Sequence, residues 1–214
     1  MIIYFSRIFC FLRASETKYL ISMIKVGHDK KELVVSILIE SFESNLSVNY
    51  IAGANNGKSK RIKALMEYSF EICYLFGDVY MSEDGLACAL VLYPDKRKTT
   101  LKSIMLDIYL LFRCIGLLNI GKAISREQNI KKIQPKEPMT YLWFLGVNPS
   151  SQHLGIGSKL LQELILDSKK KNLPIYLETS TVKNLSWYNR FGFQIYDQLE
   201  FTYSLYFLKR NVLK

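Results

Sequence analysis

The residues best suited to chemistry in this chain lie in a short glycine-containing loop, Q-H-L-G-I-G at 152–157. The apolar run 141–147 before it predicts a buried strand. An amphipathic helix is predicted after it, with lysines at 169–171 near its end and the apolar positions Leu160, Leu161, Leu164, Ile165 and Leu166. Such a loop directs free backbone N–H groups and the positive end of the helix dipole at one point. Gly155 and Gly157 let a bulky anion approach the backbone, so the pattern predicts a pyrophosphate site.

Two common nucleotide-binding fingerprints do not fit this loop. The dinucleotide pattern G-x-G-x-x-G lacks its third glycine, and the phosphate-loop pattern G-x-x-x-x-G-K-[ST] is absent. The segment 53–59 does end in G-K-S, but its glycines are one residue too close and no buried strand precedes it. We expect a flexible loop there, with Ser59 capping the next helix.

The loop does match Q-x-x-G-x-G, with Gln152, Gly155 and Gly157 in register. It resembles the acyl-coenzyme A loop of the GCN5-related N-acetyltransferases, the GNAT family. The alternative is an ordinary strand–turn–helix connection with two incidental glycines.

A second part of the chain supports the resemblance. A short apolar strand is predicted over 173–179, and N-L-S-W-Y-N-R-F-G-F follows at 184–193. This order of strand, asparagine-led helix, aromatic–tyrosine pair and Gly-Phe is similar to the end of a GNAT domain. The resemblance is close over 141–207 and weak over 24–93. The segments LGVNP, LETS and WYNRFGF are most similar to those of puromycin-type acetyltransferases.

The resemblance implies an α/β (α+β) fold: a mixed, mostly antiparallel central sheet flanked by helices and split beside Leu145 to admit acetyl-CoA. It also implies direct acetyl transfer from acetyl-CoA to a primary amine. The acceptor stays open between an antibiotic, a polyamine, an amino acid and a peptide N-terminus. One alternative is a non-catalytic acyl-CoA sensor on the same fold. Another is a nucleic-acid or membrane adaptor.

The resemblance implies that the strand end pairs its backbone with the pantetheine arm, as an added strand would. The amide of Leu145 or Val147 would stabilise the oxyanion. Gly146 suggests a bulge or a close backbone approach. The predicted cofactor-binding residues are Leu145, Gly146, Val147, Gln152, His153, Leu154, Gly155, Ile156, Gly157, Ser158 and Asn184.

Two catalytic residues are predicted. Tyr188 matches the family tyrosine that protonates the leaving thiolate, and its alternative role is that of a core aromatic residue. Glu178, at the end of its strand, would accept the amine proton directly or through water, or it is simply solvated. Asn184 is expected to cap the short helix, and the resemblance implies that it also reaches the cofactor arm; the alternative is the capping role alone.

Charge and cysteines narrow the function. The chain of 214 residues has a formal net charge of +10, but its basic residues are scattered and no nucleic-acid motif appears. We therefore expect no nucleic-acid partner and no membrane partner. The cysteines at 10, 73, 88 and 114 form no C-x-x-C pair, and there are only two histidines, so no metal site is expected. Cys73 and Cys88 are expected to be buried free thiols, which suits a reducing cytoplasm.

The chain is predicted to hold a single acetyltransferase domain over 23–214. Residues 1–22 form an extension that is not native if Met23 is the true start; they show no signal-peptide cleavage site. A capping box at 29–32 is expected to open a helix that runs to about Ser44. Two strands, 79–81 and 86–93, are expected to form a hairpin.

The apolar stretch 99–121 is predicted to be a helical insert of one or two helices. Asp107 and Arg113 interrupt it, which argues against a membrane span. It would wall the acceptor pocket, join two subunits in a homodimer, or pack in the core. Residues 126–138 are expected to form a charged linker, and 201–208 a closing strand.

Overall fold

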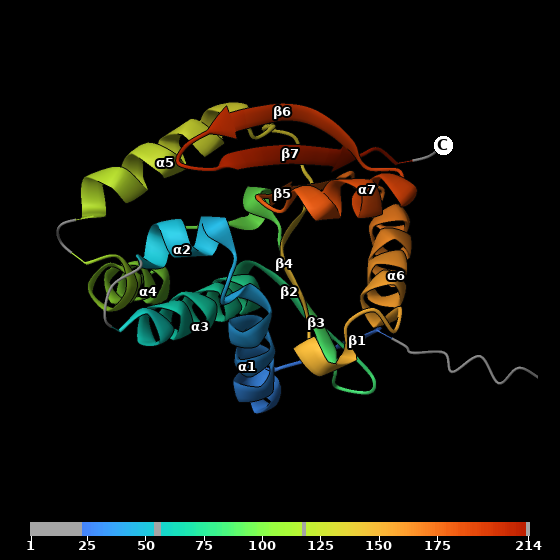
Figure 1. Ribbon diagram of the computed structural model, residues 1–214, viewed down its shortest axis with the longest axis horizontal. Helices are drawn as coiled ribbons and strands as arrows, with labels where there is room; N and C mark the ends of the chain where they lie inside the picture. Colours follow the sequence, from blue (N-terminus) through green and yellow to red (C-terminus); the bar gives the residue numbers. More distant parts are fainter. Residues whose placement is uncertain (1–22, 54–56, 117–118, 213–214) are drawn as a thin grey trace, which may run out of the picture.

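A seven-stranded sheet in the order β1-β2-β3-β4-β5-β7-β6 forms the centre of the protein (Figure 1). The computed structural model describes residues 23–53, 57–116 and 119–212, so the extension 1–22 lies outside the described residues. Among the strands of the described residues, only β4 and β5 pair in parallel, and the other five pairs are antiparallel. The strands are β1 (Met23–Lys25), β2 (Gly77–Ser82), β3 (Ala87–Leu92), β4 (Thr140–Val147), β5 (Ile175–Thr179), β6 (Gln194–Glu200) and β7 (Ser204–Arg210). The predicted mixed, mostly antiparallel sheet is confirmed.

Helices cover both faces of the sheet because each face carries alternate apolar residues of the strands. One core lies between the sheet and α1, α2 and α3; the other lies between the sheet and α6 and α7. A smaller third cluster joins α5 to β7. The helices are α1 (Lys31–Phe42), α2 (Leu46–Ala52), α3 (Lys58–Phe76), α4 (Leu101–Leu110), α5 (Ile120–Ile133), α6 (Ile156–Lys170) and α7 (Val182–Arg190), with a π-helical turn η3 at Leu111–Ile115 and short 3-10 turns at His28–Lys30, Pro94–Lys96 and Pro149–Ser151.

Strand β4 has the irregular shape that opens the sheet. Its register against β3 shifts between Leu142 and Phe144, so Trp143 has no partner residue there and forms a bulge. Its parallel pairing with β5 ends at Leu142, opposite Leu177. Beyond this point the two strands diverge, which confirms the predicted split beside Leu145.

Some local predictions near the N-terminus were wrong. Helix α1 begins at Lys31 after a 3-10 turn, and no side chain caps it, so the capping box does not form. Gly57 precedes α3 in a left-handed conformation, so Ser59 lies inside that helix and does not cap it. Helix α2 was not predicted; its cap is Asn45, whose side chain accepts from the Val48 amide at 3.1 Å.

The insert is helical and longer than predicted. Helix α4 and η3 lie within 99–121, but α5 occupies most of the segment 126–138 that was expected to be a linker.

Two predictions of burial have different outcomes. Leu166 of α6 is 57% exposed, so it does not belong to that helix's buried face. Cys73 and Cys88 are buried free thiols, as predicted, and so is Cys114.

Candidate active site

The backbone of β4 presents an open edge where β5 has diverged. The amide of Asn148 bonds the carbonyl of Leu86 at 2.8 Å, on the β3 side. Residues in an antiparallel ladder alternate in direction, so Gly146 also faces β3, whereas Leu145 and Val147 face away from it. Pairing with β5 has already ended at Leu142, which leaves these two backbone positions without a strand partner. This is the edge on which an extended ligand could add as a strand.

The loop after β4 turns its amides toward the same opening. His153 and Gly155 have φ angles of 65° and 82°, which place both in the left-handed region. Within the described residues no backbone acceptor is found for the amides of 153–155. The first amides of any α-helix have no acceptor within the helix, and this holds for the start of α6. The dipole of α6 makes the same end positive. Together they form a concave set of donors for an anion.

Gly157 allows the loop to approach the strand. A Cβ at this position would lie 2.9 Å from Cγ2 of Val147, which is too close. A Cβ on Gly155 would meet nothing within 4 Å, so Gly155 is needed for its φ angle rather than for space. Gly146 allows α1 to approach: a Cβ there would lie 3.1 Å from Ser41 Oγ. The close neighbours of Gly146 are side chains of α1 rather than a backbone, and the bulge lies at Trp143.

Side-chain hydrogen bonds hold these parts together. The carbonyl of Val147 accepts from Ser41 Oγ at 2.8 Å and from Gln152 Nε2 at 3.3 Å, which joins α1 and the loop to the strand end. Trp187 Nε1 donates to Ser158 Oγ at 3.1 Å, which places α7 over the start of α6. Gln152 therefore positions the strand end. Ser41 was not predicted, and no local pattern marks it.

Tyr188 lies in the core between the sheet and helices α6 and α7, against which the end of β4 also packs. Its ring packs edge-on against Trp187 and Phe193, at centroid distances of 4.7 and 5.5 Å. The same cluster includes Leu145 and Ile156, so Tyr188 belongs to the face that carries the loop. Among the described residues no hydrogen-bond partner is found for its hydroxyl. Burial raises the pKa of Tyr188, so the phenol keeps its proton at neutral pH.

Glu178 lies on the opposite face of β5. Its neighbour Leu177 packs in the core with Tyr188, and side chains alternate along a strand. Glu178 Oε1 accepts from Gln134 Nε2 at 2.8 Å, and Arg126 lies close enough to influence it. Burial raises the pKa of Glu178, against the opposing charge of Arg126.

The insert supplies part of this second face. Arg126 of α5 donates from Nε to the Tyr203 hydroxyl at 3.0 Å and from Nη2 to Ser47 Oγ at 2.6 Å. Gln134 follows the same helix. Sequence reasoning missed both because it assigned their segment to a linker.

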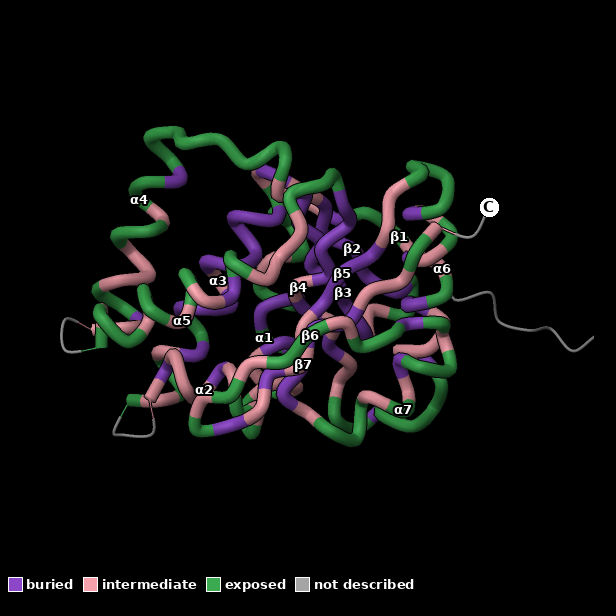
Figure 2. Tube along the Cα trace, turned by 90° about the horizontal axis from the view of Figure 1, so that it is seen from above, coloured by how far each residue is buried: buried purple, intermediate pink, exposed green. Residues whose placement is uncertain are grey.

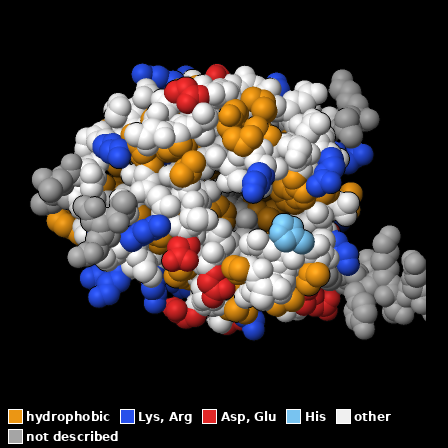
Figure 3. Space-filling model, viewed as in Figure 1, with side chains coloured by type: hydrophobic (Ala, Val, Ile, Leu, Met, Phe, Trp, Pro, Cys, Tyr) orange, Lys and Arg blue, Asp and Glu red, His pale blue; other side chains and the backbone are white. Residues whose placement is uncertain are grey.

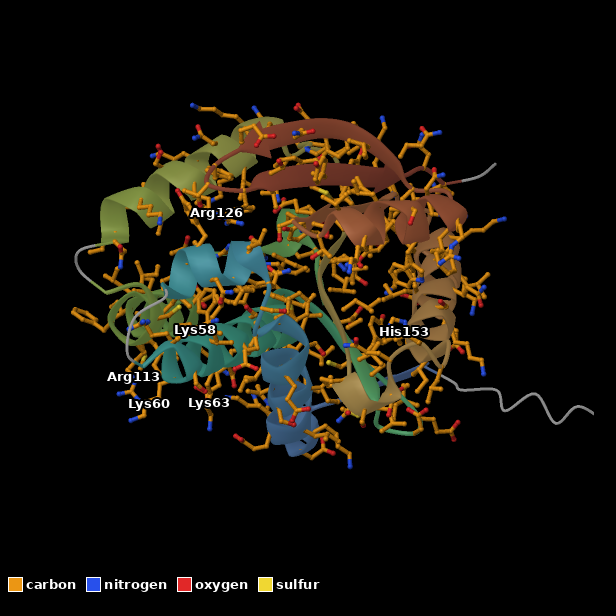
Figure 4. All side chains as sticks on the ribbon, in the orientation of Figure 1. Lys58, Lys60, Lys63, Arg113, Arg126 and His153 are labelled. Carbon is orange, nitrogen blue, oxygen red and sulfur yellow. The ribbon has the colours of Figure 1, made fainter. Side chains whose placement is uncertain are left out.

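The structure brings together most of the predicted cofactor-binding residues. The exceptions concern side chains: Leu154 is 70% exposed, Ile156 is buried in the core, and Asn184 is exposed inside α7, whose N-cap is Thr181. The predicted cap at Asn184 is therefore wrong. His153 lies at the rim of this opening, between α6 and α1 (Figure 4), and Figure 3 shows a hollow beside it. Within the described residues no group of His, Cys, Asp and Glu could hold a metal ion.

Comparisons with known proteins give a family-model match over part of the chain and a shared fold. Residues 115–195 match the model of an acetyltransferase (GNAT) domain. One similar structure is a histone acetyltransferase HPA2 and related acetyltransferase from Corynebacterium glutamicum: it is 20% identical, the match covers 90% of this chain and 97% of that one, and the TM-score is 0.67. Arylalkylamine N-acetyltransferase 2 from Aedes aegypti is 13% identical, with 90% and 99% coverage and a TM-score of 0.60. Residues 115–195 thus match a GNAT acetyltransferase domain, and the described chain has the GNAT fold.

Proposed function

We propose that this protein transfers an acetyl group from acetyl-CoA directly to a primary amine. The observation that carries the proposal is the open edge of β4 at Leu145 and Val147 beside a loop of unpaired amides. The residues present fit the ligand: amides 153–158 suit a pyrophosphate, and the open edge suits the two amides of a pantetheine arm. Acetyl-CoA would supply the activated thioester.

In this proposal the backbone near the split performs the electrostatic work. The amide of Leu145 or Val147 donates to the carbonyl oxygen as the amine attacks and negative charge develops there. A carbon–nitrogen bond forms and the carbon–sulfur bond then breaks. The fixed strand, held by Ser41 and Gln152 through Val147, keeps this donor in place without reorganisation.

Tyr188 is the proposed proton donor to the departing thiolate. Burial keeps its hydroxyl protonated, and no described residue competes for that proton. The same burial would raise the pKa of a thiol formed beside it, so transfer between the two stays feasible.

Glu178 is the proposed acceptor of the amine proton, through water. Its pKa is raised by burial, and a base works best when its pKa lies near the working pH. Because Glu178 and Tyr188 lie on opposite faces of β5, the amine and the thioester would enter the split from opposite sides. This geometry separates the proton acceptor from the proton donor.

The test is a titration with acetyl-CoA followed by a coenzyme A-release assay over a panel of amines. The panel includes puromycin because 145–149, 177–180 and 187–193 resemble the puromycin-type branch. Binding together with turnover of at least one amine supports the proposal. Binding without turnover over the whole panel points instead to an acyl-CoA sensor, and the absence of binding refutes the site.

A further inference from the structure

An apolar row runs along the outward face of α4 and η3. Leu101, Ile104, Met105 and Ile108 recur at three- and four-residue intervals, and Phe112 extends the row into η3. Figure 2 shows α4 at one end of the molecule with most of its residues exposed. The exposed fractions are 83% for Leu101, 42% for Ile104, 70% for Met105, 49% for Ile108 and 63% for Phe112. We refer to these five side chains as the α4 row.

The opposite face of the same helix is already occupied. Ser103 is buried, and Leu106, Tyr109 and Leu110 pack against the core that contains α3. The α4 row is therefore not the misplaced core face of this helix but a second apolar face that no described residue covers. Contiguous exposed apolar surface of this kind marks a contact site.

Basic side chains gather at the same end of the molecule. Figure 4 shows Lys58, Lys60 and Lys63 of α3 and Arg113 of η3 near α4. Lys60 is exposed and Lys58 is half-buried, and neither has an ion-pair partner among the described residues. The surface beside the α4 row is thus positively charged.

The acidic side chains of this end are already engaged with the protein. Glu67 accepts from the Tyr109 hydroxyl and lies 3.7 Å from Lys63. Asp107 accepts from the Tyr68 hydroxyl at 2.7 Å and lies 3.7 Å from Arg97. Neither carboxylate pairs with Lys58 or Lys60.

We propose that the α4 row, flanked by these basic side chains, docks the protein on an anionic lipid surface. An apolar stripe enters the headgroup–acyl boundary while lysines and arginines contact anionic headgroups. A second copy of the chain fits less well, because a symmetric contact would bring the same positive side chains together. A nucleic acid would leave the apolar stripe without a partner.

The docking is peripheral rather than spanning. No single helix among the described residues is long and apolar enough to cross a membrane, and α4–η3 passes such a test only together with α5, across a bend of 120°. The fifteen residues 101–115 would extend only ~22 Å as a helix, against a hydrocarbon core of ~30 Å. Asp107 and Arg113 argue against a membrane span, but they do not argue against a surface contact, so this proposal departs from the expectation of no membrane partner.

The experiment is flotation of the full chain with vesicles of phosphatidylcholine alone and of phosphatidylcholine with phosphatidylserine. We expect binding to the anionic vesicles, weakened by salt. The double variant Met105→Glu with Phe112→Glu should reduce binding by about tenfold or more. It removes apolar surface that insertion would bury, and it adds negative charges that the anionic headgroups repel. Removing Lys58 and Lys60 with alanine should cost roughly fivefold for each lysine.

The matched control is Leu166→Glu, which changes an exposed leucine on α6. It should bind like the unchanged protein, and circular dichroism should show that all variants are folded. Residues 1–22 are present in every variant, so binding that they provide would survive the α4 substitutions and overturn the proposal. It is also overturned if the unchanged protein ignores anionic vesicles, or if light scattering shows a dimer that Met105→Glu dissociates.

Discussion

Replacing Gly157 with alanine tests whether this glycine makes room for the strand or for the ligand. The sequence suggested the ligand, but the Cβ would lie 2.9 Å from Cγ2 of Val147. Relieving such overpacking costs about 1–3 kcal/mol. Alanine in a helix gains about 1 kcal/mol over glycine. We therefore expect Gly157→Ala to lower the free energy of unfolding by about 0–2 kcal/mol, the difference between these terms.

The loop shift should also weaken acetyl-CoA binding. Misaligning one amide that bonds a phosphate oxygen costs about 1.5–3 kcal/mol, which raises Kd roughly ten- to hundredfold.

The decisive comparison uses Val147→Ala, which deletes the methyl group that Gly157→Ala would meet. In that background Gly157→Ala should become neutral or stabilise by up to about 1 kcal/mol, because only the helix propensity remains. The coupling between the two substitutions is then about 1–3 kcal/mol, measured by urea unfolding of all four proteins. Isothermal titration should show acetyl-CoA affinity recovering in the double variant relative to Gly157→Ala.

Gly155→Ala is the matched control. Its Cβ would meet nothing, but φ is +82°, so strain of about 1–2 kcal/mol should appear equally in both backgrounds. If Gly157→Ala costs the same with and without Val147→Ala, the packing argument is refuted. If stability recovers but affinity does not, the Cβ obstructs the ligand itself, as first expected.

Three further predictions concern single side chains. Tyr188→Phe should lower kcat about 10²- to 10⁴-fold and kcat/KM with it while leaving acetyl-CoA affinity unchanged; full turnover with a good acceptor would disprove the role of proton donor. With Glu178 as the base, kcat/KM should rise with pH through its raised pKa, and Glu178→Gln should abolish that rise; an unchanged profile would remove Glu178 from the mechanism. Burial alone would raise the pKa of Glu71, but hydrogen bonds from Lys31, His28 and Lys102 lower it to about 2, so stability present above its ordinary pKa of 4.5 should be lost as pH falls toward 2. Thermal unfolding of Glu71→Gln should lack that part of the acid dependence, and an equal slope in both proteins would contradict it.

The strand–loop–helix unit at 141–170 was predictable because its information is local. A continuous apolar run, glycines at fixed spacing and an amphipathic period each report on residues that are neighbours in the chain. The same holds for the helix that carries Tyr188, because its motif N-L-S-W-Y-N-R-F-G-F is a continuous stretch of sequence at 184–193. These segments contain the loop amides and the proposed proton donor.

The bulge at Trp143 and the surroundings of Glu178 could not be predicted. A bulge depends on the register with β3, and the pKa of Glu178 depends on Arg126, which is 52 positions away in the chain. Helix α5 was taken for a linker because its surface is charged and its few buried residues, such as Ile130, become apolar contacts only against β7.

In the stretch 99–121 the local sequence predicted the helix, and tertiary contacts decided which of its faces is buried. Its composition alone predicted helix, since apolar residues recur all around it. Composition cannot say which of two apolar faces is buried, because both would gain by leaving water. Packing of Leu106 and Leu110 against α3 made that choice, and it is the tertiary structure that left Met105 and Phe112 facing outward beside a basic surface.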